Sequence, residues 1–239
     1  MADEGPRGWG APLYARVLEA AQVGTGTSVL DIGCGSGVFA RAAADRGALV
    51  SGVDSDPSAV AAAAAAVPEG TFRVGDAHDP PAGPFDVVAA VQLLAHVTNP
   101  LVVLRGAARV GGVVAVTAWG REQECDVRLF GDALARWLPP RPQPGGPPPI
   151  TEPARLRRLV ELAGLRVDSF DEVPCPFDYP DEDALVGPLL ASGMGRHAAN
   201  RAGPGAVREA VLRRLAGNRT PEGGYRLHNL FRVLVARPV

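Results

Sequence analysis

The sequence predicts an α/β fold built on a parallel sheet with crossover helices. From residue 11 to about residue 119, short apolar runs of strand character alternate with alanine-rich stretches of helical character. A glycine-rich turn, "DIGCGSG" at 31–37, follows the first of these runs, where a strand passes into a helix. The chain has 239 residues and 46% hydrophobic residues, which suits a single domain over 1–239 with a substantial core.

Residues that begin and end helices mark out the first half of the chain. Gly47 suits a left-handed helix end, Asp56 and Pro57 suit a helix start, and Gly111 turns the chain into a strand. We expect helices near 11–23, 37–46, 57–66 and 100–109, and strands near 28–32, 49–53, 71–75, 86–91 and 113–118.

The second half changes character beyond Trp119. The stretch "PPRPQPGGPPPI" at 139–150 excludes a helix or a central strand and predicts a loop. Two strands that bracket helical segments suggest that the last strand returns antiparallel at the sheet edge, with the helical insertion over the strand ends. The expected elements are a helix near 153–163, a strand near 165–172, helical segments over 181–217 and a strand over 226–236.

Composition and charge narrow the class of partner. The formal net charge is −2 and no run of basic residues stands out, which argues against a nucleic-acid surface. The three cysteines are too few and too scattered for a disulfide framework, and no His, Asp or Asn cluster has the spacing of a metal site. The longest apolar run, 59–67, is too short to cross a membrane. We expect a cytoplasmic protein with no bound metal, no membrane partner and no nucleic acid; the oligomeric state stays open.

Two ligand classes use a glycine-rich turn of this kind. Gly35, Gly37 and Ala40 satisfy the G-x-G-x-x-A pattern of NAD-binding folds, and Asp54 lies where a ribose-binding acid belongs. A dinucleotide, however, brings a pyrophosphate to this turn, and Asp31 would repel it. S-adenosylmethionine carries an ammonium and a sulfonium and no phosphate, so Asp31 favours this ligand.

The stretch "VLDIGCGSG" resembles the first motif of class I S-adenosylmethionine-dependent methyltransferases, D-x-G-x-G-x-G. Later stretches resemble that family in the same order: "GVDSD", "VGDAHDPP", "PFDVVAAVQLLAHVTNP" and "VGGVVAVTAW". Beyond residue 119 the resemblance is general, to small-molecule methyltransferases of bacterial biosynthesis. It implies a Rossmann-like, seven-stranded mixed sheet with a reversed last strand, helices on both faces, and a helical cap near the C-terminus.

The resemblance also implies roles for individual residues in binding the cofactor. The glycines let the backbone approach the methionine part, and Asp31 accepts from its ammonium. Asp54 takes the two ribose hydroxyls, Asp76 the adenine amino group, and Gln92 borders the methionine part. The full set is Asp31, Gly33, Gly35, Gly37, Asp54, Ser55, Asp76, Ala77 and Gln92.

Catalytic and acceptor residues are less clearly marked. His96 follows the fourth strand and is a candidate base, with a purely structural contact in the loop as the alternative. Trp119 ends the fifth strand and should border the acceptor, since ligands collect at the carboxyl ends of parallel strands. Tyr179, His197 and Tyr225 are candidates for the acceptor pocket, with packed or solvated positions as the alternative.

Together these features predict methyl transfer from S-adenosylmethionine to a small-molecule acceptor in bacterial secondary metabolism, with S-adenosylhomocysteine as product. We expect residues 11–119 to bind the cofactor, 120–150 to form a proline-rich lid, and 151–239 to hold the acceptor and complete the sheet. One alternative is a protein that binds the cofactor without donating its methyl group, in a structural, regulatory or rearrangement-assisting role. Another is an NAD-dependent oxidoreductase.

Overall fold

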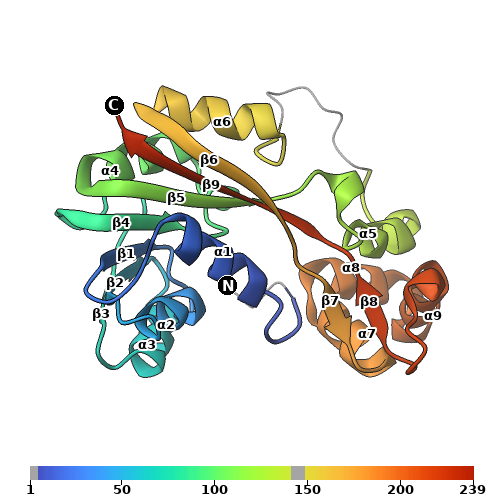
Figure 1. Cartoon of the computed structure of the whole chain (residues 1–239). Coiled ribbons are helices and arrows are strands. Elements are labelled where there is room, and N and C mark those ends of the chain that lie inside the picture. Colours follow the sequence, from blue (N-terminus) through green and yellow to red (C-terminus); the bar gives the residue numbers. More distant parts are fainter. Residues whose placement is uncertain (1–4, 141–148) are drawn as a thin grey trace.

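The computed structural model describes residues 5–140 and 149–239 (Figure 1). The α-helices are α1 Ala11–Ala20, α2 Val38–Ala44, α3 Pro57–Ala66, α4 Pro100–Val110, α5 Arg128–Leu134, α6 Pro153–Leu162, α7 Glu182–Ala191, α8 Gly193–Ala202 and α9 Pro204–Arg214. The strands are β1 Ser28–Ile32, β2 Leu49–Asp54, β3 Thr71–Val74, β4 Phe85–Ala90, β5 Gly111–Trp119, β6 Leu165–Pro174, β7 Phe177–Tyr179, β8 Tyr225–Leu227 and β9 Leu230–Pro238. Short 3-10 turns are η1 Glu122–Glu124, η2 Ala135–Trp137 and η3 Ala216–Asn218.

The main sheet has seven strands in the order β3-β2-β1-β4-β5-β9-β6. Strands β1 to β5 pair in parallel, and β9 runs antiparallel to both of its neighbours, β5 and β6. The mixed sheet with a reversed last strand is therefore confirmed. The expected place of that strand at the sheet edge is wrong, because β6 forms the edge. Strand β9 is buried from Phe231 to Ala236, which suits an interior strand, whereas β6 carries exposed polar residues along much of its length.

Helices cover both faces of the sheet, as the sequence predicts. Leu13 of α1 and Phe39 of α2 belong to the buried cluster on one face. Leu104 of α4 and Leu156 of α6 belong to the cluster on the other face. The carboxyl ends of β1, β2, β4 and β5 are consequently left for loops, and these loops hold the candidate site.

A helical cap lies beyond the end of β5 (Figure 1). It consists of α5, α7, α8, α9, β7 and β8. Helix α9 packs against α5, α7 and α8, and the short strands β7 and β8 pair beside them. The expected helical region over 181–217 divides into separate helices because Ser192 caps α8 and Gly203, at a φ of +84°, separates α8 from α9. The final strand expected over 226–236 is likewise interrupted between β8 and β9.

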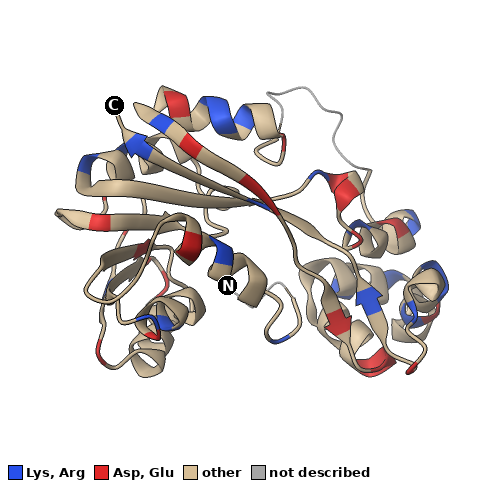
Figure 2. Cartoon of the chain, viewed as in Figure 1, with Lys and Arg blue, Asp and Glu red and all other residues tan. Residues whose placement is uncertain are grey.

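The structure describes only part of the proline-rich loop expected over 120–150. The elements η1, α5 and η2 lie between residues 122 and 137, and residues 141–148 lie outside the described residues. The lid function stays a prediction. Basic and acidic residues are interspersed over the sheet and the cap (Figure 2). Within residues 5–140 and 149–239, no helix has the length and apolar character needed to cross a membrane.

Candidate functional site

Asp54 ties the glycine loop to the end of β2. Its Oδ2 accepts from the backbone N–H of Gly35 at 2.9 Å, and its Oδ1 accepts from the N–H of Asp56 at 3.0 Å. The N–H groups of Gly33 and Cys34 both donate to the carbonyl of Val53, at 2.7 and 3.1 Å. The loop between β1 and α2 is thus held against β2 by backbone and side-chain bonds together.

The three glycines of the loop are needed for different reasons. A Cβ at Gly33 would lie 2.6 Å from a Leu93 methyl, and one at Gly37 would lie 2.8 Å from the Cα of Ala63 in α3. A Cβ at Gly35 would meet no atom of the described residues within 4 Å. All three have positive φ, at +74°, +52° and +83° along the chain. Packing therefore accounts for Gly33 and Gly37, whereas Gly35 borders open space where a ligand can approach.

Asp31 is the buried carboxylate of this site. It lies in β1, is 1% exposed, and its Oδ2 has no hydrogen-bond partner among the described residues. Burial, and then the nearby negative charge of Asp54, raise the pKa of Asp31 to about 7. A buried carboxylate oxygen without a partner is costly, so the site fits a cation that supplies both charge and hydrogen bonds. The ammonium of S-adenosylmethionine is such a group.

Asp76 and its neighbours follow β3. The Oδ1 of Asp76 accepts from the backbone N–H of His78 at 2.9 Å and contacts its Nδ1 at 2.7 Å. These hydrogen bonds, the backbone one first, hold the pKa of Asp76 below its usual value. Ala77 is half-buried, and Ser55 is exposed directly after β2. Both contacts use Oδ1 of Asp76 and leave Oδ2 free of them, and the predicted role of Asp76 in binding the adenine amino group stays a prediction.

Gln92 is bound to a residue that sequence reasoning missed. Both its backbone N–H and its Nε2 donate to the hydroxyl of Thr117 at 2.8 Å. Gln92 has a φ of +53°, a left-handed conformation that is uncommon for a residue other than glycine and often marks a functional site. Thr117 is 1% exposed in β5. The signal in the sequence was a single hydroxyl inside the apolar run "VVAVTAW".

His96 lies in the same loop as Gln92, between β4 and α4. The residue is exposed, and its backbone N–H donates to the carbonyl of Leu93 at 2.8 Å. Asn99 ends the loop and caps α4 by accepting from the N–H of Val102 at 3.3 Å. The loop therefore places Gln92 and His96 at the carboxyl end of β4, and the role of His96 as a base stays a prediction.

Trp119 belongs to an aromatic cluster at the end of β5. Its ring centroid is 4.2 Å from that of Phe231, 5.9 Å from that of Phe177 and 6.3 Å from that of Trp9, on which it stacks. Trp9, which precedes α1 and is 8% exposed, is not marked by any feature of the sequence. A lone tryptophan in a polar, glycine-rich segment carries no pattern that would place it here.

A cavity of about 580 Å³ opens beside Trp119. Its walls come from residues 119–131, from 149–152 and from Met194 of α8. Arg128 lines it, with a buried Nε that has no partner among the described residues. The lining residues are Trp119, Gly120, Glu122, Gln123, Cys125, Val127, Arg128, Gly131, Pro149, Thr151, Glu152 and Met194.

The other three acceptor candidates do not line this cavity. Tyr179 and Tyr225 face each other across β7 and β8 and are 9% and 3% exposed. Burial raises the pKa of Tyr179 to about 12. His197 lies in α8, and its buried Nε2 has no partner among the described residues. Packed positions, the alternative left open from the sequence, describe the two tyrosines well.

A buried arginine joins the two walls of the cavity. Arg232 of β9 is 1% exposed and donates to Glu124 at 2.6 Å, to Glu172 at 3.1 Å and to the carbonyl of Thr151 at 3.3 Å. Glu124 follows β5, and Thr151 precedes α6. One guanidinium therefore fastens the segments on either side of residues 125–150. A single charge in the apolar run "LFRVLVA" was the signal in the sequence.

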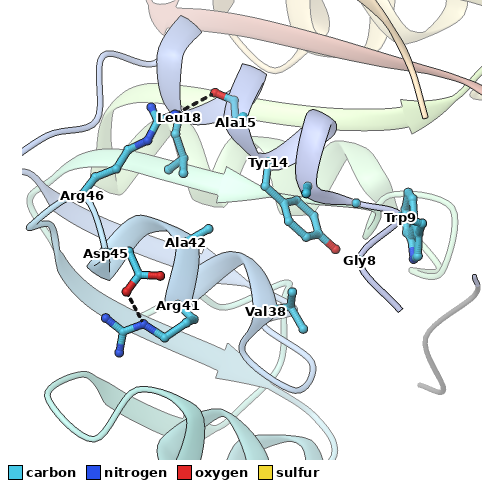
Figure 3. A pocket seen from close by; sticks show the side chains of 12 residues that line it. Gly8, Trp9, Tyr14, Ala15, Leu18, Val38, Arg41, Ala42, Asp45 and Arg46 are labelled. Atoms are coloured by element: carbon cyan, nitrogen blue, oxygen red, sulfur yellow. Dashed lines mark hydrogen bonds and ion pairs between the residues drawn. The ribbon is translucent and has the colours of Figure 1, made fainter. Parts of the chain in front are cut away.

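A smaller cavity of about 290 Å³ lies between α1 and α2 (Figure 3). Its charged side chains are engaged within the protein: Arg41 donates to Asp45 at 2.9 Å, and Arg46 donates to the carbonyl of Ala15 at 3.3 Å. Figure 3 shows Tyr14 of α1 lying across the gap toward the start of α2. Because α2 begins directly after Gly37, this cavity adjoins the glycine loop from the side of α1.

Comparisons with known proteins agree with this geometry. A family model described as a methyltransferase domain matches residues 30–116. A ubiquinone biosynthesis O-methyltransferase of Thiobacillus denitrificans is 32% identical over 168 residues, which are 66% of this chain and 72% of that protein. A ribosomal protein L11 methyltransferase of Dechloromonas aromatica is 43% identical over 119 residues, 47% of this chain but only 38% of that protein.

Solved structures show the same fold over nearly the whole chain. A protein of Bacillus halodurans described as a candidate methyltransferase has a TM-score of 0.63 at 16% identity, covering 95% of this chain and 99% of its own. The [4+2]-cyclase SpnF has a TM-score of 0.59 at 23% identity, covering 95% of this chain and 80% of its own. The chain belongs to the class I S-adenosylmethionine-dependent methyltransferases. S-adenosylmethionine is the cofactor of that family.

Proposed function

We propose that this protein transfers a methyl group from S-adenosylmethionine to a hydroxyl of a small-molecule acceptor. The observation that carries the proposal is the buried carboxylate of Asp31, whose Oδ2 lacks a partner among the described residues at the carboxyl end of β1. Gly35 borders open space in the loop that follows. A cationic ligand that approaches bare backbone satisfies both features.

The residues around this point fit the three parts of the cofactor. Asp31 accepts from the ammonium. Each oxygen of Asp54 already accepts one backbone N–H and retains a lone pair for a ribose hydroxyl. The Oδ2 of Asp76 accepts from the adenine amino group, and Gln92, held by Thr117, borders the methionine part.

The bound cofactor supplies an electrophilic methyl group whose leaving group, a neutral thioether, needs no proton. The protein's contribution is then to position the two reactants, which can lower a barrier by roughly 7–11 kcal/mol. His96 accepts the proton of the acceptor hydroxyl from the loop after β4. No group of three or more His, Cys, Asp or Glu that could hold a metal occurs within the described residues.

The acceptor binds in the cavity beside Trp119. This cavity lies at the carboxyl end of β5. The parallel neighbour of β5 in the sheet is β4, whose following loop carries Gln92 and His96. Its volume of about 580 Å³ is in the range of small-molecule sites. Trp119 offers an apolar surface, and Arg128 brings a positively charged side chain to the cavity wall. A hydroxyl is the first acceptor to test, because the Thiobacillus denitrificans relative is an O-methyltransferase. A place in secondary metabolism and a cytoplasmic location stay predictions.

Binding of the cofactor without methyl transfer remains the second candidate function. The observation that favours it is the similarity in fold to a [4+2]-cyclase, because that name describes ring formation rather than group transfer. Both functions require cofactor binding, so they are separated only by the fate of the methyl group. Membership of the methyltransferase family counts against the NAD alternative.

A methyl-transfer assay tests the proposal. The protein is incubated with S-adenosylmethionine carrying a ¹³C methyl group and a panel of phenols, catechols and aliphatic alcohols, and S-adenosylhomocysteine and labelled products are measured by mass spectrometry. We expect label on at least one oxygen, and its loss in Asp31→Asn but not in Asp79→Asn, a change at a 92% exposed carboxylate. Tight cofactor binding with no label on any acceptor favours the second function. Binding of NAD in place of S-adenosylhomocysteine contradicts both.

A further inference from the structure

His78 connects the loop after β3 with the loop between β4 and α4. Its Nδ1 lies 2.7 Å from Oδ1 of Asp76, and its Nε2 lies 3.4 Å from the backbone nitrogen of Asn99 and 3.5 Å from the hydroxyl of Thr98. Asp76 follows β3, whereas Thr98 and Asn99 end the loop between β4 and α4. The imidazole side chain is 26% exposed and bridges the two.

The partners decide where the imidazole proton lies. The N–H of Asn99 can only donate, so Nε2 accepts from it. A neutral ring then carries its proton on Nδ1, which donates to Asp76. The same oxygen of Asp76 also accepts from the backbone N–H of His78 at 2.9 Å. Two donors therefore hold Oδ1 and fix the direction of Oδ2.

Asp76 needs such support because its side chain is 70% exposed. An exposed carboxylate without fixed partners samples several rotamers, and a ligand must then select one of them. The segment that carries it is also docked on α4: a Cβ at Gly106 would lie 2.8 Å from the ring of Pro80. The backbone N–H of Asp79 donates to the carbonyl of Asp76 at 3.0 Å. These contacts hold the backbone of the loop that carries Asp76, and His78 fixes the side chain of Asp76.

We propose that His78 is a positioning residue for the adenine end of the cofactor. It orients the carboxylate of Asp76 and joins the adenine loop to the loop that carries Gln92 and His96. This inference rests on the proposed function, in which Asp76 receives the adenine amino group. The sequence "DAHDPP" alone indicates no role for the histidine at this position.

Substitutions that keep one ring nitrogen at a time test the bridge. His78→Asn places an amide donor near the position of Nδ1 and keeps the bond to Asp76. His78→Gln reaches the position of Nε2 and keeps the bond to Asn99, while His78→Ala loses both. Binding is measured by calorimetry with S-adenosylhomocysteine and with methylthioadenosine, which has the adenosine part but no amino-acid part.

We expect His78→Ala and His78→Gln to weaken the binding of both ligands by the same factor. This factor is about three- to tenfold, as expected for the loss of an exposed hydrogen-bonded pair. His78→Asn should restore binding to within about twofold of the wild type. With a methyl acceptor, the wild type and His78→Gln should differ in KM for the cofactor more than in kcat. Asp79→Asn, a matched change in the same loop, should leave both affinities unchanged.

The outcomes separate this inference from the function on which it rests. Wild-type affinities in His78→Ala, or equal weakening in His78→Asn and His78→Ala, overturn the positioning role. If Asp76→Asn also binds both ligands normally, the placement of adenine at Asp76 is wrong, and the inference fails with it. If Asp76→Asn weakens both ligands while His78→Ala does not, the adenine site stands and only the role of His78 is rejected.

Discussion

Replacement of Asp31 by asparagine should change the pH dependence of stability. The pKa of Asp31 is raised from 3.8 to about 7 in the folded protein, chiefly by burial. Between these values the unfolded chain releases the proton and the folded protein keeps it, so the free energy of unfolding falls as pH rises from about 4 to about 7. About three pKa units at roughly 1.4 kcal/mol each give a loss of about 4 kcal/mol across this window. The amide side chain of the Asp31→Asn variant does not titrate, so the variant shows no such loss.

Urea unfolding of the ligand-free protein at pH 5 and pH 8 measures this difference. The buried amide of the variant has a cost of its own, on the order of 1–3 kcal/mol, but that cost is the same at both pH values. Between pH 5 and pH 8 the free energy of unfolding of the wild type should therefore fall by about 2–3 kcal/mol more than that of the variant, because about two units of the pKa shift of Asp31 lie above pH 5. This difference is the diagnostic quantity. Parallel pH profiles for the two proteins would refute the reasoning.

Three further substitutions test other parts of the site. Asp54→Ala should weaken S-adenosylhomocysteine binding by about tenfold or more, because a charge-assisted contact to the ribose is lost; normal binding by calorimetry would show that the ribose lies elsewhere. Gly35→Ala should lower the free energy of unfolding by about 1 kcal/mol, because Gly35 has a φ of +52°, and it should also weaken cofactor binding. A loss of stability with unchanged cofactor binding would argue against close approach of the ligand to Gly35. Arg232→Met should lower the free energy of unfolding by about 2–3 kcal/mol, at the low end for a buried ion pair because Glu172 is half exposed. An unchanged urea midpoint in Arg232→Met would contradict the role of Arg232 in fastening the segments that carry Glu124 and Thr151.

The alternation of strands and helices was legible from the sequence because apolar periodicity and helix-ending residues act locally. Gly47 has the expected left-handed φ of +82°, and Asp56 caps α3 by accepting from Ser58 at 2.8 Å. The position of β9 was not legible, because strand order depends on which neighbour best buries an apolar strand on both faces. The same holds for the break between β8 and β9.

The sequence likewise indicates some residues of the candidate site and not others. Asp31 and Asp54 lie at or near the ends of β1 and β2, and Gly35 lies in the loop directly after β1, so a local motif could indicate all three. Thr117 and Arg232 act through contacts between segments distant in sequence, with Gln92 and Glu124 respectively, and no local pattern indicates such partners. Tyr179 and Tyr225 illustrate the opposite problem, since aromatic residues near a site can equally well be packed in the core.

Proton release on cofactor binding tests the central claim, that the buried carboxylate of Asp31 receives the cofactor's ammonium, most directly. Calorimetry of S-adenosylhomocysteine binding at pH 7, in buffers of different ionisation enthalpy, counts the protons exchanged. With a pKa of about 7 before binding, Asp31 should release about half a proton when the ammonium pairs with it, and Asp31→Asn should release none from this position. Tight binding without proton release, or equal release in the wild type and the variant, would contradict the account.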